Sequence, residues 1–198
     1  NDDYPLQIKV ASLPNARLQV YFLENEDFFK RKQIFHDENE TWFDDNALRT
    51  IFFARGALET VKKFGWPPHV IHCHGWMTSL IPLYLKTAYK KDPVFGYTKS
   101  IFTVQNDQFE ESLNATFNKK ALVNTDMKEK DFELYAPGTN EALTLGAMKY
   151  ADVLVAGQAD LNPTFKAELK PSRYKKIIQH DENWTNDVTD LLELYKTL

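Results

Sequence analysis

The sequence predicts an α/β protein with a Rossmann-like, doubly wound and mainly parallel sheet, preceded by an N-terminal antiparallel hairpin. Two alternating segments flank a turn near the start of the chain, and helical patterns then alternate four times with short apolar strands. Hydrophobic residues make up 43% and charged residues 26% of the 198 residues, which is typical of a folded globular protein and excludes disorder as the main state. Alternating helices and strands require right-handed crossovers between parallel strands.

The hairpin is predicted from residues 7–13 and 17–23, which alternate in character around Pro14-Asn15-Ala16. Residues 24–45 are polar but contain five aromatic residues whose rings need somewhere to bury, so a long ordered loop with room for a short helix is expected there.

The remaining elements follow from periodicity and stop signals. Strands are predicted at 70–74, 99–104, 152–156 and 175–179. Helices are predicted from a cap at Asp44 or Asp45 up to Gly65, at 77–89, at 140–150, at 163–170, and from Thr185 or Asn186 onward. Residues 107–138 are mixed and polar, and short helices around loops are expected there. The whole of 1–198 is interpreted as one domain.

Charge and composition exclude several classes of partner. Lys+Arg number 24 and Asp+Glu 28, a net charge of −4, so the basic excess of a nucleic-acid-binding domain is missing. No apolar run reaches the ~18–20 residues that span a bilayer, so no membrane partner is expected. The single cysteine, Cys73, cannot form an intrachain disulfide, which favours a reducing, cytoplasmic location.

The glycines exclude the common phosphate-binding loops. There are seven, and no two lie closer than eight positions. Neither G-x-G-x-x-G nor a Walker loop nor G-x-S-x-G fits this spacing. The sequence therefore predicts no bound cofactor.

Ligands of open α/β sheets bind beyond the carboxyl ends of the strands. The polar residues at the four predicted ends are His74-Gly75-Trp76, Gln105-Asn106-Asp107, Gln158 with Asp160, and His180-Asp181. If the strands are neighbours, these loops converge, and their amides and imidazoles suit a hydroxyl-rich ligand. The alternative, that these polar residues only cover the edge of a sheet, stays open.

A metal site is not predicted. His72 and His74 share one face of a strand, but a zinc site needs three or four converging ligands. Cys73 points to the opposite face and is interpreted as a small core residue. The aromatic residues Trp42, Phe43 and Trp66 could stack on sugars, but packing in the core or in loops is the expected role of each.

Several segments contain distinctive sequence motifs. They are Val20-Tyr21-Phe22 with Asn25, Asp37-Glu38-Asn39, Asp45-Asn46 with Arg49, Ile71-His72-Cys73-His74-x-Trp76, Ile101-Phe102-Thr103-Val104-x-Asn106 and Tyr150-Ala151-Asp152. In this order they resemble the N-terminal domain of bacterial glycogen synthases and plant starch synthases. The likeness is closest over residues 17–110 and looser over 140–170.

The resemblance implies the GT-B arrangement, in which two Rossmann-like domains transfer glucose from ADP-glucose to an α-1,4-glucan with retention. It implies ADP-glucose as the donor substrate, a glucan or oligosaccharide as ligand, and substrate contacts at His74, Gly75, Trp76, Gln105 and Asn106. It also implies that the chain lacks the first strand and helix of the domain, with their lysine–glycine loop, and the C-terminal nucleotide-binding domain.

The chain departs from the family pattern at its site residues. Gly75 stands where the family has aspartate, while Met77 and Gln105 stand where it has histidines, and Asp107-Gln108-Phe109 replaces an aromatic–glutamine–glycine turn. Glutamine donates hydrogen bonds but cannot carry the positive charge of an imidazolium. Losing one preorganised charge-stabilising donor typically lowers turnover by ~10²–10³. We therefore assign no catalytic residue and expect a pseudoenzyme.

Three functional hypotheses follow. The first is a glucosyltransferase that needs a second domain or a partner synthase chain to supply the nucleotide site. The second, favoured for mechanism, is a non-catalytic module that binds glucan or a partner synthase. The third, ranked far last, is a metal enzyme using His72 and His74.

Overall fold

The computed structural model describes residues 4–16, 18–106, 109–173 and 175–198. Arg17, the first residue of a predicted strand, and Asp107 and Gln108, part of the substituted turn, lie outside the described residues.

The predicted N-terminal hairpin is present. Strands β1 (Gln7–Leu13) and β2 (Leu18–Glu24) pair antiparallel, with Gln7 opposite Glu24 and Leu13 opposite Leu18. Asn15 in the connecting turn has a φ of 68°, a conformation that asparagine adopts more readily than most residues.

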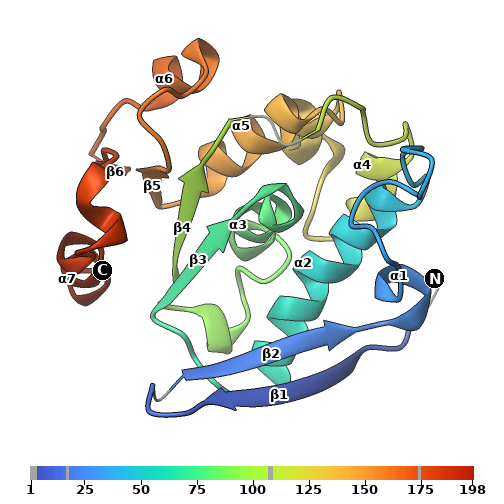
Figure 1. The fold of residues 1–198 in the computed structure, drawn as a ribbon, viewed down its shortest axis with the longest axis horizontal. Coiled ribbons are helices and arrows are strands. Elements are labelled where there is room, and N and C mark those ends of the chain that lie inside the picture. Colours follow the sequence, from blue (N-terminus) through green and yellow to red (C-terminus); the bar gives the residue numbers. More distant parts are fainter. Residues whose placement is uncertain (1–3, 17, 107–108, 174) are drawn as a thin grey trace.

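The four predicted strands form one parallel sheet (Figure 1). Its order is β3 (Val70–His74), β4 (Lys99–Val104), β5 (Val153–Ala156) and β6 (Lys176–Ile178). Each strand lies within one residue of its predicted bounds, so the prediction of an α/β fold with a mainly parallel sheet and an N-terminal hairpin is confirmed.

The helices fill the connections between these strands. The α-helices are α1 (Glu26–Phe29), α2 (Asn46–Lys63), α3 (Leu80–Lys86), α4 (Phe117–Ala121), α5 (Asn140–Tyr150), α6 (Pro163–Glu168) and α7 (Thr189–Lys196). The 3₁₀ helices are η1 (Trp76–Thr78), η2 (Pro93–Phe95), η3 (Glu129–Tyr135) and η4 (Glu182–Thr185). Within the described ranges, no helix is both long enough and apolar enough to cross a bilayer.

The predicted helix over 77–89 is wrong at both ends. An α-helix that began at 77 would need an N–H at Pro82 to bond the carbonyl of Thr78, and proline has none. The chain instead makes η1 first, and α3 begins at Leu80, so that Pro82 falls in its first turn. The closing helix is likewise displaced, because η4 precedes it and α7 begins only at Thr189.

The sheet separates two groups of core residues. On one face, Cys73, Phe102 and Leu154 pack in the cluster that also contains the buried faces of α3 and α5. On the other face, Ile101, Val153 and Val155 pack against Leu194 of α7. Figure 1 shows α7 on the opposite side of the strands from α3 and α5. Both faces are therefore covered by helices, as a doubly wound layer requires.

Helix α5 is held in place by a close approach from η3. A Cβ at Gly146 would lie 2.3 Å from the ring of Tyr135, so only glycine lets this ring pack directly on the helix. The Tyr135 hydroxyl donates to the carbonyl of Ser79, 3.0 Å away, just before α3. This contact fixes α5 relative to the loop that follows β3.

Asp152 ties three elements together at the start of β5. Its carboxylate accepts from the Ser100 N–H at 2.8 Å, the Ser100 hydroxyl at 2.9 Å and the Lys86 ammonium at 2.6 Å. Burial alone would raise the pKa of this carboxyl, but the hydrogen bonds from Lys86 and Ser100 outweigh burial and hold the pKa below the usual value. The charged form of Asp152 therefore stabilises the fold.

We predict that Asp152→Asn lowers the free energy of unfolding by about 1–2 kcal/mol at pH 7, since it weakens charge-assisted hydrogen bonds. The unfolded carboxyl titrates near its usual pKa of about 3.9, above that of the folded state. The contribution of Asp152 is therefore complete above about pH 4 and is lost as pH falls through the lower folded pKa. Urea unfolding at pH 7 and pH 3 measures the difference.

The matched control is Asp126→Asn, because Asp126 also pairs with a lysine, Lys91, but on an exposed surface. Such pairs contribute little, so this variant should unfold like the wild type. Equal stability of the two variants at pH 7 would contradict the role given to Asp152.

Candidate functional site

The carboxyl ends of β3 and β4 lie side by side at one edge of the sheet. His74 is opposite Thr103 in the parallel register, so the loops that leave the two strands start next to each other. A small cavity lies between them and the N-terminal end of α5, with a volume of about 10 Å³, space for about one water molecule. It is lined by Gly75, Trp76, Phe102, Thr103, Gln105, Asn106, Asn140 and Thr144. We call this the edge cavity.

Gly75 makes the sharp turn out of β3. Its φ of 74° and ψ of 163° lie in a region that is essentially restricted to glycine. The turn directs Trp76 inward, where only 3% of its surface is exposed. A residue with a Cβ is strained at position 75, so this edge is built around a glycine.

Trp76 belongs to an aromatic cluster that forms one wall of the site. Its ring centroid lies 5.1 Å from that of Phe35, 6.1 Å from that of Trp42 and 4.8 Å from that of Phe109. Trp42 stacks on Phe109 at 5.0 Å, which agrees with the packing role predicted for it. The rings come from the loop before α2, the turn after β3 and the segment after β4.

Asn106 forms hydrogen bonds with the loop that follows β5. Its side-chain N–H donates to the carbonyl of Asp160 at 3.0 Å, and its side-chain oxygen accepts from the Asn162 N–H at 2.7 Å. Its backbone N–H donates to the Gln158 side chain at 3.1 Å. Asn106 therefore positions the loop after β5 against the end of β4, which is a structural role beside the predicted substrate contact.

The loop after β5 is linked to the same edge, through the Gln158 side chain and the Asn106 N–H. The Gln158 amide donates to the Asp160 carboxylate at 2.9 Å, and this hydrogen bond is the main cause that lowers the pKa of Asp160. The residues after β6 make local contacts: His180 packs against the Trp184 ring, with ring centroids 5.4 Å apart, and Asp181 caps η4.

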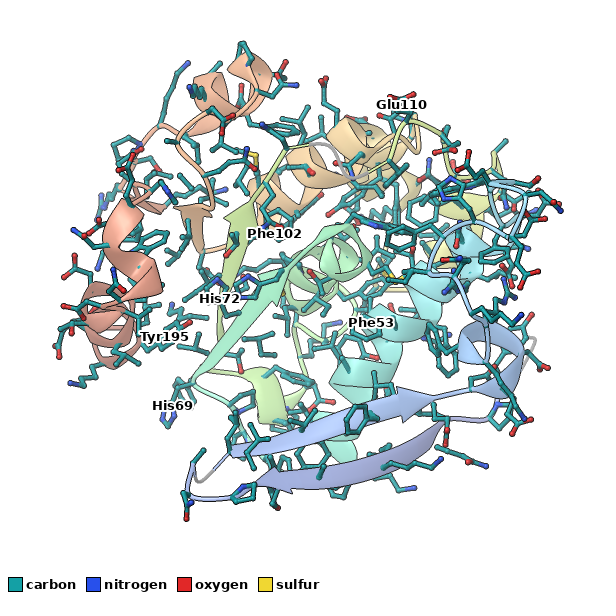
Figure 2. All side chains as sticks on the ribbon, in the orientation of Figure 1. Phe53, His69, His72, Phe102, Glu110 and Tyr195 are labelled. Atoms are coloured by element: carbon teal, nitrogen blue, oxygen red, sulfur yellow. The ribbon has the colours of Figure 1, made fainter. Side chains whose placement is uncertain are left out.

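His72 and His74 lie on the face of β3 that α7 covers. Nδ1 of His72 is 2.6 Å from the Tyr195 hydroxyl and Nε2 is 2.7 Å from the Thr103 hydroxyl, so both ring nitrogens are engaged. Figure 2 shows His72 on β3 pointing toward Tyr195 on α7. Burial, and secondarily the neighbouring His74, lower the pKa of His72 to about 4. The ring is neutral near pH 7.

The two histidines do not gather further metal ligands. Their ring centroids are 4.1 Å apart, and His74 is exposed. Across the described residues, no three His, Cys, Asp or Glu side chains converge as a metal site would require.

Sequence reasoning missed the contribution of α5 to this edge. Asn140 and Thr144 both line the edge cavity. Residues four apart share one face of a helix, and Thr139 caps the helix by accepting from the Ala142 N–H. Two polar residues four positions apart at the start of an otherwise apolar helix could have indicated that this end of α5 contributes to the site.

Comparisons with known proteins show which family this chain is similar to. The family described as "Starch synthase catalytic domain" matches residues 2–175. The glycogen synthase of Chlorobium limicola is 37% identical over 150 residues, which are 75% of this chain and 30% of that protein. That of Chlorobium phaeovibrioides is 34% identical over 165 residues, 83% of this chain and 32% of that protein.

One solved structure shares the fold over nearly the whole chain. The catalytic domain of starch synthase IV from Arabidopsis thaliana, bound to ADP and acarbose, matches with a TM-score of 0.57 at 20% identity. The match covers 98% of this chain and 36% of that one. The chain therefore spans about a third of the length of these relatives.

We predict that stability falls as pH drops from about 6.5 to 4, because the unfolded chain, with an ordinary histidine pKa, takes up a proton that folded His72 does not. The His72 ring should titrate by NMR with a midpoint near pH 4. His72→Gln should remove this part of the pH dependence. A His72 midpoint near 6.5 would contradict the burial argument.

We also predict that Asn106→Ala lowers the free energy of unfolding by about 1–2 kcal/mol, because it removes two hydrogen bonds to the partly exposed 160–162 backbone. Hydrogen exchange should become faster at the Asn162 N–H. Unchanged exchange there would show that Asn106 does not hold this loop.

Proposed function

This chain belongs to the starch synthase catalytic domain family, and from that premise we propose that it binds α-1,4-glucan at the edge formed by residues 74–76 and 105–106. We further propose that the 198-residue chain transfers no glucose by itself. Its role is then that of a glucan-binding module that acts with a partner synthase chain or domain in the cytoplasm.

The observation that carries this proposal is the neutral lining of the edge cavity. Apart from Gly75, every residue that lines it has an aromatic, amide or hydroxyl side chain. Sugar hydroxyls are recognised by such neutral donors and acceptors, whereas the phosphates of a nucleotide sugar are usually held by cations or by successive backbone N–H groups. The edge therefore suits the glucan rather than the nucleotide.

The absence of transfer is inferred from Gln105 and Gly75. At the positions where the family resemblance implies a histidine and an aspartate, these residues carry no ionisable group. His72 does not substitute for them, since it is neutral and both of its nitrogens are engaged. No described side chain of the edge cavity can therefore carry a charge or exchange a proton near neutral pH.

The ligand class is supported by the Arabidopsis starch synthase IV structure, which was bound to ADP and acarbose. Acarbose is an oligosaccharide analogue, and we extend oligosaccharide binding to this chain. ADP-glucose is the donor we propose for the complete enzyme in which such a domain works.

A second candidate is an active glucosyltransferase. It is favoured by the family match over residues 2–175 and by 37% identity to a glycogen synthase. The two candidates differ in one measurable property, the transfer of glucose.

We predict that calorimetric titration of the chain with maltohexaose gives saturable binding. Gln105→Ala should raise its Kd about threefold to tenfold, the loss expected for one neutral hydrogen bond. Gln7→Ala, on the exposed hairpin, is the control and should bind like the wild type. Labelled ADP-glucose with glycogen should give no incorporation.

No heat at millimolar maltohexaose would overturn glucan binding at this edge. Incorporation of label by the chain alone would overturn the non-catalytic proposal and establish the transferase.

A further inference from the structure

Asn140 is a buried polar residue at the edge cavity. It is the first residue of α5, and only 3% of its surface is exposed. Its side-chain nitrogen has no hydrogen-bond partner among the described residues. Buried polar groups are nearly always hydrogen-bonded, so an unpaired amide calls for a specific explanation.

Asn46 shows how a buried asparagine at the first position of a helix is hydrogen-bonded when its role is structural. Asn46 is also the first residue of a helix, α2, and is also buried. Its side-chain nitrogen donates to the Phe35 carbonyl at 2.9 Å, and its oxygen accepts from Arg49 at 2.5 Å. Asn46 ties a loop to its helix, whereas Asn140 has no such bond through its nitrogen.

The surroundings of Asn140 are those of a ligand contact. Asn140 lines the edge cavity, and Thr144, one turn further along α5, lines it too. Phe102, labelled on β4 in Figure 2, lines it as well. The N-terminal end of α5, where the helix dipole is positive, adds a further preference for an acceptor atom.

The size and charge of the edge cavity limit which chemical group of a ligand can accept this hydrogen bond. About 10 Å³ admits one water-sized group and excludes a phosphate. The lining carries no charge that would pair with an anion. A single hydroxyl oxygen fits both limits.

We propose that the Asn140 side-chain nitrogen donates a hydrogen bond to one hydroxyl oxygen of a glucan bound at this edge, with that hydroxyl inserted in the edge cavity. This inference rests on the proposed function and adds a substrate-binding residue to the site. The described residues offer no acceptor for this nitrogen, and the sugar hydroxyl would supply one.

The experiment compares Asn140→Leu with Asn46→Leu, which replace matched asparagines by an apolar side chain of similar size. Asn140→Leu should keep or raise the Tm, because it removes an unpaired buried amide. It should also raise the Kd for maltohexaose about threefold to tenfold. Asn46→Leu should lower the Tm, since it removes the hydrogen bonds that Asn46 makes with the Phe35 carbonyl and with Arg49.

Asn140→Ala separates loss of the donor from blockage of the cavity. This variant removes the amide without filling the space, and its Kd should rise by a similar factor. If both Asn140 variants bind maltohexaose as the wild type does, while Gln105→Ala binds more weakly, the inference is wrong and the proposed function stands. If the Tm of Asn140→Leu falls as far as that of Asn46→Leu, Asn140 is structural and the inference is also wrong.

A wild-type chain that does not bind maltohexaose would overturn the proposed function and, with it, the sugar contact of Asn140. The two failures are thus distinguished by the wild-type titration.

Discussion

The parallel pairing of β3 with β4 is the constraint on which the candidate site depends. Parallel strands end at the same edge of a sheet, and the register that places His74 opposite Thr103 starts the two following loops side by side. The apolar residues of β4 alternate between the two clusters that fill the faces of the sheet, so this register cannot slip by one residue without exposing the core. Asp152 adds a polar tie by joining β4 to the start of β5 and to Lys86 of α3. The core thus sets the geometry of the site, and Trp76 and Phe102 belong to both.

Polar residues near this edge divide into those that the fold uses and those that it leaves available. Asn106 and His72 have each of their polar side-chain atoms bonded within the chain, and their role is to position a loop and a helix. Asn140 is buried, and its side-chain nitrogen has no partner in the part of the chain that the structure describes, which is unfavourable for stability. Proteins carry such local conflicts mostly at functional sites, where a ligand later satisfies the group. Hydrogen bonding therefore separates Asn106 and His72, whose side chains the fold uses, from Asn140, although the three residues lie near one edge.

Membership of the starch synthase family fixes the scaffold but not the chemistry of this edge. A fold supports many activities, and the activity resides in the groups that face the ligand. Here those groups are neutral: a glycine in a conformation that favours glycine, a glutamine, two asparagines, hydroxyls and aromatic rings. Such an edge offers neutral hydrogen-bond donors and acceptors, and its lining carries no ionisable side chain. The aromatic cluster around Trp76 closes one side of it with residues from three separate segments.

The sequence by itself determined the elements and most of the edge. Periodicity and stop signals located the hairpin, the four strands and α5, because each of these depends on neighbouring residues, and strand ends then indicated His74-Gly75-Trp76 and Gln105-Asn106. The helix over 77–89 was mispredicted because Pro82 interrupts the backbone hydrogen bonds that the apolar pattern suggested. Only the tertiary structure decided that His72 meets Tyr195, 123 residues away, and that α5 presents Asn140 at the ends of β3 and β4. Side-chain pairing between distant segments depends on how the layers pack against one another, and a local sequence pattern carries no information about that packing.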